Sequence, residues 1–521
     1  MNDPGRIGSA TTPNVVESFE VSTDQKEFTF KLREGMKWSD GEPVTTEDVR
    51  FMIEDVLKDQ EATAVFPQWL QAANKVDGTP VELEVVDEYT FKLKFDQPYG
   101  GLPMRLTTGD YQDIMRPAHY LKQFHKKYAD PAELEKLVDE AGFEKGEWYN
   151  LLNSKAPSGW DSGKPEGLTY PTLYPYIHVK DGDVRIFERN PYYFKIDSEG
   201  NQLPYIDRIE STYVANQELA SVKILAGEVD TSYEWAPLTK VALYKENEAQ
   251  NGTKVYTNTT LHRTAADVFI NLTYEDENWR KVVQDIRFRQ ALNLGLNKEE
   301  IVDTVYYGFA KVSDMQGTEY DPEAANKLLD EMGMVKGSDG YRIGPNGKTF
   351  NMPFVYSEWM TAYPAFAQLV TEQWKALGLN VQLKQAENSF IDTMVNANEL
   401  QVNCHFSHGP VMAMYDDWGY GRWGRLWNLW YTTNGKEGEE PPADVLKFYQ
   451  MVDSIKVQTL EEIQKTRQGL REEMRKHLWY LIPNEEVAQP VVNNKNLRNF
   501  DDAGFQIANS FADEQWWFDK E

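Results

Sequence analysis

A change of pattern near residue 265 limits most strongly what this chain can fold into. From there on, short apolar segments alternate with amphipathic ones. The pattern predicts a buried strand over 269–272 and a helix over 287–296. A helix over 366–377 leads directly into a strand over 381–383. Strands that alternate with helices are typical of a mixed sheet covered on both faces. We therefore predict an α/β fold for this part.

Two further helices of this part have recognisable ends. Asn297 is a predicted N-cap, and Glu300 stands where a side chain can return the hydrogen bond to the cap backbone. Gly308 is expected to end that helix. Asp321 and the proline after it predict the start of another helix, which Gly333 closes.

The chain before residue 265 is patterned differently. Residues 28–32 alternate apolar with polar side chains, as do residues 89–95, so both predict half-buried strands. Thr45 is a predicted helix cap with Asp48 at the reciprocal position. Residues 176–187 carry a hairpin signature. In contrast, residues 121–170 are charged and then rich in Gly, Pro and Ser, which predicts a surface excursion.

Length and charge narrow the class of protein. A chain of 521 residues is too long for one hydrophobic core, so two or three domains are expected. There are 54 Lys and Arg against 83 Asp and Glu, a net charge of −29. Nucleic acids and anionic lipids need surplus cations, so neither is an expected partner. No run of about 18 apolar residues exists, and no membrane-spanning segment is predicted.

The single cysteine, Cys404, allows no internal disulfide. It stands beside His405, a pair that suggests a nucleophile and its base. The flanking Val402 and Phe406 instead favour a buried strand, and we predict a structural role.

Motifs for catalysis are missing or incomplete. Gly347-Lys348-Thr349 resembles the end of a phosphate-binding loop, but Arg342 occupies the position that requires glycine. His405 and His408 lack the further ligands of a metal site. Asp416 and Asp417 are adjacent, so in an extended chain they point apart and cannot flank one glycosidic bond. We predict no catalytic residue, metal or cofactor. A carbohydrate-active enzyme (a glycosidase) stays as the alternative, because acidic residues and tryptophans are abundant.

A group of tryptophans is the positive signal. They are Trp418, Trp423, Trp427 and Trp430, with Gly419, Gly421 and Gly424 between them. Core helices seldom carry so many glycines, so we predict a loop or irregular turn. Flat aromatic faces suit sugar rings and peptide side chains. The alternative is a loop packed on its own aromatic residues.

Several motifs, in order along the chain, resemble one family. They are Phe28-Thr29-Phe30-Lys31-Leu32-Arg33-Glu34-Gly35-Met36-Lys37-Trp38, Asp40-Gly41-Glu42-Pro43, Glu188-Arg189-Asn190-Pro191-Tyr192-Tyr193-Phe194, Gly200-Asn201-Gln202-Leu203-Pro204-Tyr205-Ile206-Asp207, Asp285-Ile286-Arg287-Phe288-Arg289-Gln290-Ala291-Leu292 and Asp321-Pro322-Glu323-Ala324-Ala325. This set resembles family 5 extracellular solute-binding proteins, the oligopeptide, dipeptide, nickel and oligosaccharide receptors of bacterial ABC importers.

The resemblance implies a two-lobed α/β fold of the periplasmic-binding-protein type, with an extra inserted domain and a hinge. It implies domain II at 1–168, domain I at 169–262 and again at 490–521, and domain III at 263–489. The chain would cross between the lobes near 262–270 and 488–494. A monomer is expected, lipid-anchored or periplasmic, that holds an oligosaccharide or oligopeptide and delivers it to permease subunits. Family members begin with a signal before these motifs, so Met1 is expected to be internal to a longer protein.

The expected ligand contacts are aromatic and acidic. Peptide receptors of the family hold the ligand's amino terminus with an acid in the region that matches 415–418, which points to Asp416 or Asp417. Further aromatic candidates follow predicted strands or turns. They are Tyr356, Trp359, Tyr274 and Trp235.

Overall fold

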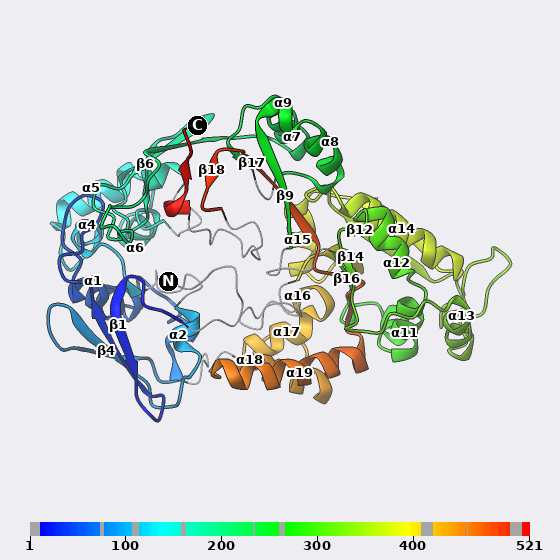
Figure 1. The fold of residues 1–521 in the computed structure, drawn as a ribbon. Coiled ribbons are helices and arrows are strands. Elements are labelled where there is room, and N and C mark those ends of the chain that lie inside the picture. The colour runs from blue at the N-terminus through cyan, green and yellow to red at the C-terminus, as the bar shows by residue number, and fades with distance from the viewer. Residues whose placement is uncertain are drawn as a thin grey trace.

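The computed structural model describes residues 11–72, 78–106, 114–157, 163–232, 235–259, 266–407, 420–455, 457–500 and 513–520. Figure 1 shows two parts side by side, joined at the top by strands β9 and β17. We call residues 11–259 with 488–520 the first part, and residues 266–487 the second part.

The first part begins with an antiparallel sheet in the order β1-β2-β4-β3. Its strands are β1 (Val16–Val21), β2 (Glu27–Leu32), β3 (Glu82–Val85) and β4 (Thr90–Lys94). Both predicted strands are confirmed. The inward-facing rings of Phe30 and Phe91 stack with centroids 5.2 Å apart, and both side chains are buried.

The predicted cap at Thr45 is also confirmed, since Thr45 and Asp48 form a complete capping box at α1 (Thr46–Arg50). The Asp48 carboxylate also accepts the Trp38 indole N–H at 3.2 Å and the Ala118 amide at 2.9 Å. The helix continues as a π-helical stretch, Phe51–Leu57.

The predicted surface excursion over 121–170 is wrong. The segment holds α5 (Pro131–Glu140) and α6 (Trp148–Ser154), preceded by α4 (Ala118–Leu121). These helices enclose a core of their own: Phe51, Met52, Val56, Ala62, Ala118, Leu121, Phe124, Leu134, Val138, Trp148, Leu151 and Leu152. The charged residues that suggested a surface segment occupy the outer faces of short amphipathic helices, while the apolar residues point inward.

Three small sheets complete the first part, and the smallest is the pair β18 (Leu497–Arg498) with β19 (Trp517–Phe518). The hairpin predicted over 176–187 is confirmed as β5 (Tyr176–Lys180) and β6 (Val184–Arg189), with β7 (Arg208–Thr212) added on the far side. The remaining sheet has the order β8-β17-β9 and packs against helices α7, α8 and α9. Its elements are α7 (Gln217–Leu225), β8 (Thr231–Ser232), α8 (Val241–Glu246), α9 (Glu248–Asn251), β9 (Thr253–Thr259) and β17 (Ala488–Asn494).

The second part is built on a mixed sheet in the order β13-β12-β14-β10-β15. Its strands are β10 (Asp267–Ile270), β12 (Asn351–Tyr356), β13 (Asn380–Gln385), β14 (Val402–His405) and β15 (Tyr480–Leu481). β12 runs parallel to β13 and β14, and β10 runs antiparallel to β14. The predicted α/β fold of this part is confirmed.

Helices surround this sheet and share one large core with it, except α15, whose Ile391 and Val395 form a separate small cluster with Val355 and Leu400. They are α10 (Glu277–Val283), α11 (Ile286–Leu294), α12 (Lys298–Val305), α13 (Pro322–Glu331), α14 (Tyr363–Ala376), α15 (Asn388–Asn396), α16 (Tyr420–Trp423), α17 (Arg425–Thr432), α18 (Ala443–Ile455) and α19 (Leu460–His477). A short pair, β11 (Lys311–Val312) with β16 (Asn484–Glu485), lies beside α12.

The cap of α12 departs from the predicted reciprocal pair. The Asn297 side chain accepts the Glu300 amide at 3.1 Å, as expected. The Asn297 amide, however, donates to the Gln373 side chain at 3.0 Å, and that side chain donates in turn to the Glu300 carboxylate at 2.9 Å. A glutamine from α14 therefore replaces the local hydrogen bond, a tertiary contact that local spacing does not reveal.

Candidate functional site

Two segments join the first part to the second. β9 ends at Thr259 and β10 begins at Asp267, while β16 leads back into β17. β9 and β17 pair antiparallel along their whole lengths, from Thr253 opposite Asn494 to Thr259 opposite Ala488. The connection is thus a two-stranded ribbon, which Figure 1 shows in green and red between the two parts.

One edge of the large sheet lies next to this connection. β10 starts there, and its first residue, Asp267, pairs with His405, the last residue of β14. Because β12 is parallel to β14, β12 ends at the same edge with Tyr356. Ligands of open α/β sheets commonly bind beyond the carboxyl ends of strands. We therefore expect a binding site at this edge of the sheet.

An aromatic group occupies the edge. The Trp359 indole lies parallel to the His405 imidazole, with centroids 5.9 Å apart and 15° between the planes. The Phe406 ring lies 5.7 Å from the same indole. Trp359 is nevertheless 45% exposed, a large value for a tryptophan. We call Trp359, His405 and Phe406 the edge cluster.

Buried hydrogen bonds hold the edge cluster in place. The Phe406 amide donates to the Tyr363 hydroxyl at 3.0 Å. The next residue, Ser407, donates its hydroxyl to the Asp267 carboxylate at 2.6 Å, and all three partner side chains are fully buried. The exposed indole thus lies on a rigid support, which lowers the conformational entropy lost when a ligand binds.

Cys404 points away from the edge cluster into the core. It is buried, and burial raises the pKa of its thiol to about 12. A nucleophile needs the thiolate form, which this burial disfavours. The prediction of a structural cysteine in a strand is confirmed.

The described members of the tryptophan group lie on helices and not in the predicted loop. Trp423 ends α16, and Trp427 lies on α17, with Gly424 as the residue between the two helices. Trp423 is fully buried and stacks on Trp479, with centroids 5.5 Å apart. Gly421 lies within α16 and Gly424 separates the two short helices, so the number of glycines misled the prediction.

The other described members of that group differ in how far they are buried. Trp427 is 6% exposed and shares the core of the second part, whereas Trp430 is half-buried. Asp416, Asp417 and Trp418 lie outside the described residues, as does His408.

Two further candidates lie apart from the edge cluster. Tyr274 follows the far end of β10, where it is half-buried and packs edge-on against Trp279. Trp235 belongs to the first part and is 43% exposed. Three residues later, Leu238 packs against the core of the second part, so Trp235 lies close to the junction of the two parts.

The two parts also touch far from the ribbon. Val457, between α18 and α19, packs against the core beneath the first sheet. A Cβ atom on Gly100 would lie 2.8 Å from the Thr459 side chain and 3.1 Å from its backbone nitrogen. A side chain at this position would therefore require its neighbours to shift.

His405 and Phe406 were not predicted as ligand contacts. The sequence did contain a usable signal, since His405 ends an apolar strand and Phe406 follows it. Their partner Trp359 comes from a different strand connection, so only the sheet order brings the three together. Among the described residues, no group of three or more His, Cys, Asp or Glu is placed to hold a metal ion. No helix in the same ranges is long and apolar enough to cross a membrane.

Comparison with protein families gives a match over residues 10–410 to the bacterial extracellular solute-binding proteins, family 5. The chain belongs to this family. Its members are substrate-binding proteins of ABC transporters and not enzymes. Nothing in these comparisons supports a glycosidase.

Individual relatives agree with the family. A probable ABC transporter-binding protein of Deinococcus radiodurans is 24% identical over 74% of this chain and 63% of its own length. A periplasmic alpha-galactoside-binding protein of Rhizobium meliloti is 25% identical over 63% of this chain and 46% of its own length. The chain thus spans about half to two thirds of these relatives.

Solved structures share the fold. An oligopeptide-binding protein OppA is 28% identical, covers 98% of this chain and 85% of its own, and has a TM-score of 0.69. The periplasmic binding protein MelB in complex with stachyose is 18% identical, covers 98% of this chain and 77% of its own, and has a TM-score of 0.68. The predicted two-lobed α/β fold is confirmed.

Proposed function

We propose that this protein captures an oligosaccharide or an oligopeptide between its two lobes and delivers it to the permease of an ABC importer. The observation that carries the proposal is the edge cluster: an exposed indole on a rigid support, at the sheet edge where the chain arrives from the other lobe. Trp359 is proposed as a central contact, with His405 and Phe406 fixing its plane. Aromatic side chains of this kind often dominate binding energy.

The other lobe would supply the opposing surface. Trp235 is proposed as a contact from the first part, because it is exposed and close to the junction. Tyr356 ends β12 at the same edge as the cluster and is proposed as a flanking contact. The sequence after Ser407 contains Asp416, Asp417 and Trp418. These residues stay candidates for polar and aromatic contacts.

The domain boundaries stay part of the proposal. Domain II would comprise residues 1–168, domain I 169–262 with 490–521, and domain III 263–489. The core of the second part is separate from the cores of the first part, one of which includes the ribbon residues Val255 and Val492, and this supports the division. We further propose a monomer that acts outside the cytoplasmic membrane, as the periplasmic relatives do. A lipid anchor would hold it there.

Both ligand classes have support among relatives. The alpha-galactoside-binding relative and the stachyose complex point to sugars, and the OppA relatives point to peptides. A flat, partly exposed indole suits the apolar face of a sugar ring, which tilts the proposal toward an oligosaccharide.

A thermal-shift screen over di- to pentasaccharides and short peptides tests ligand class. A ligand at 100 times its dissociation constant stabilises the folded state by about 2.7 kcal/mol. Small-angle scattering with the hit should then show a smaller radius of gyration, because closure of the lobes on a solute makes the molecule more compact. No hit from either class, or an unchanged radius under saturation, would contradict the proposal.

A further inference from the structure

The contact between the two parts far from the ribbon has a defined structure. Figure 1 shows the ribbon at the top, and α18 and α19 at the bottom beside α2 (Leu102–Arg105). The loop between α18 and α19 reaches the first part here, where Val457 packs against the core beneath the first sheet. A Cβ atom on Gly100 would lie 2.8 Å from the Thr459 side chain. We call residues 457–459 the contact loop.

Side chains of the second part fix the contact loop. The Nε2 atom of Gln458 donates to the Ser454 hydroxyl at 3.2 Å, and its Oε1 atom accepts the Thr466 hydroxyl at 2.7 Å. Thr459 forms a capping box with Glu462 at the start of α19. The loop is therefore bound to both α18 and α19, and it moves with the second part.

The surface that receives the loop is fixed by the first part. The Tyr99 amide donates to the Gln25 carbonyl at 2.8 Å, and the Tyr99 ring packs edge-on against Phe95 with centroids 5.2 Å apart. Gly100 follows directly, and its lack of a side chain lets the Thr459 backbone come close. Both sides of the contact are therefore preformed, so little conformational entropy is lost when they meet.

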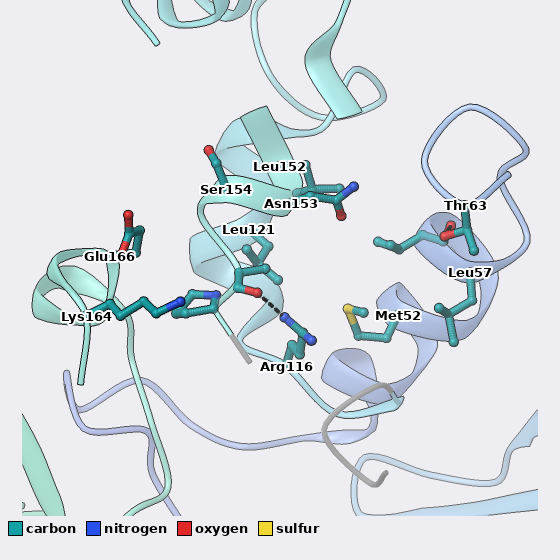
Figure 2. Close-up of a pocket in the computed structure, with 13 residues that line it drawn as sticks. Met52, Leu57, Thr63, Arg116, Leu121, Leu152, Asn153, Ser154, Lys164 and Glu166 are labelled. Carbon is teal, nitrogen blue, oxygen red and sulfur yellow. Dashed lines mark hydrogen bonds between the residues drawn. The ribbon is translucent and has the colours of Figure 1, made fainter. Parts of the chain in front are cut away.

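The core beneath the contact is filled. Ile53 of the π-helical stretch and Tyr99 belong to it, and both are 0% exposed. Met52 and Val56 of the same stretch belong to the neighbouring core and line a cavity of about 500 Å³ in the helical region (Figure 2). The cavity thus adjoins a different core from the one that Val457 contacts.

Helix α19 connects the contact loop to the strands near the ribbon. It has 18 residues and is roughly 27 Å long. At its far end, Arg289 Nε donates to the His477 carbonyl at 3.0 Å, and Tyr480 of β15 then pairs with β10, the first strand of the second part. Because the contact loop lies at the other end of this helix, a rotation that opens the two parts about the ribbon must separate the loop from Gly100.

We propose that the contact loop is a latch, which engages Gln25, Tyr99 and Gly100 in the ligand-free protein and keeps a fraction of the molecules closed. In those molecules the lobes are already in place, so less of the binding energy is used for closure. The latch therefore raises the affinity for a solute that none of its residues touches. The effect on affinity rests on the proposed function, whereas the closed fraction of ligand-free protein does not.

A double-cysteine variant, Gly100→Cys with Thr459→Cys, tests for the closed fraction without any ligand. A Cβ atom at position 100 lies 2.8 Å from Thr459 Cγ2, so the two Cβ atoms lie near the spacing of about 3.5–4.5 Å found in disulfides. The single native cysteine, Cys404, is buried and should not compete. We expect mild oxidation of the ligand-free protein to crosslink the pair rapidly, which non-reducing electrophoresis detects.

Gly100→Cys with Gln468→Cys is the matched control. Gln468 is exposed on the same helix, nine positions beyond Thr459, so this pair should not crosslink. Equal crosslinking rates for the two pairs, or no crosslinking of the first pair in the absence of ligand, would overturn the proposal.

A second variant covers the case in which a cysteine at position 100 disturbs the fold. Val457→Asp places a carboxylate against the apolar core of the first part only when the two parts are in contact. In small-angle scattering of ligand-free protein, we expect a larger radius of gyration for Val457→Asp than for the wild type, and a smaller one for the crosslinked pair.

Val56→Ala is the control for the second variant. It removes two methyl groups beside the cavity, so it should lower the melting temperature without changing the radius of gyration. If the radius of Val457→Asp equals that of the wild type, the contact loop does not hold the lobes together and the proposal is wrong.

Discussion

Two pairs of tryptophans have opposite surroundings, although all four were predicted as ligand contacts. Trp423 and Trp427 are 0% and 6% exposed, in the core of the second part, whereas Trp359 and Trp235 are 45% and 43% exposed. Aromatic side chains stabilise cores and bind ligands through the same large apolar surface. The comparison teaches that residue type and local glycine content do not separate these roles, whereas position in the sheet does.

The largest effect is expected for Trp423→Ala. This side chain is fully buried and stacks on Trp479, so its loss should destabilise the protein by about 3–5 kcal/mol. Urea unfolding measures the change, and ligand affinity of the folded variant should stay near the wild-type value. A loss of affinity without a loss of stability would reverse the assignment of Trp423 to the core.

Trp359→Ala should show the opposite behaviour. Removal of an exposed central contact typically costs about 2 kcal/mol of binding energy, or roughly a thirtyfold loss of affinity. Stability should change little, because the indole contacts mainly the edge cluster. Tyr213→Ala is the matched control, since Tyr213 is 71% exposed and follows β7 in the other lobe. If Trp359→Ala binds ligand with wild-type affinity, the edge cluster is not part of the binding site.

Trp359 and Trp235 lie in different lobes, so they can contact one ligand together only when the lobes are close. Gly100→Ala tests this requirement. An added Cβ would lie 2.6 Å from Gln25 Oε1, 2.8 Å from the Thr459 side chain and 3.1 Å from its backbone nitrogen. Gln25 can move aside within the first part, whereas relief of the Thr459 contacts is expected to move the two parts slightly apart. We expect a larger radius of gyration without ligand and roughly a tenfold weaker affinity, because fewer molecules occupy the binding-competent form.

Gly163→Ala is the control for this variant, since its added Cβ would meet nothing nearer than 3.6 Å. Small-angle scattering measures the radius of gyration of both variants, and titration calorimetry measures their ligand affinity. Equal radii and equal affinities would show that the contact at Gly100 does not influence closure.

Cys404→Ala should have the smallest effect. Cys404 precedes His405 on β14 but faces the core, so the substitution should lower stability by about 1 kcal/mol and leave affinity unchanged. The native thiol should resist alkylation until the protein unfolds, because burial raises its pKa to about 12. Rapid alkylation of the native protein would show that the Cys404 thiol is accessible, which would contradict its buried position in the structure.

Several elements could be predicted because their determinants are local. The alternation over 28–32 and 89–95 marks strands, and the Thr45 capping box forms as expected. Other predictions failed where the determinants are distant. At the cap of α12, Gln373 from another helix replaces the expected partner. The helices within 121–170 are a different case, because Leu134 and Val138 of α5 do recur at helical spacing and the charged composition obscured that local signal.

By itself the sequence determined the family, the α/β character of the second part and the importance of aromatic residues. Ordered motifs and hydrophobic periodicity carry that information, because each depends on neighbours within a few turns or strands. Only the tertiary structure decided which tryptophans are buried and which are exposed. Trp359 meets His405 because β12 and β14 run parallel and end at one edge, and Trp423 is buried because Trp479 covers it. Both contacts join residues more than 40 positions apart, so their burial depends on chain packing that no local pattern encodes.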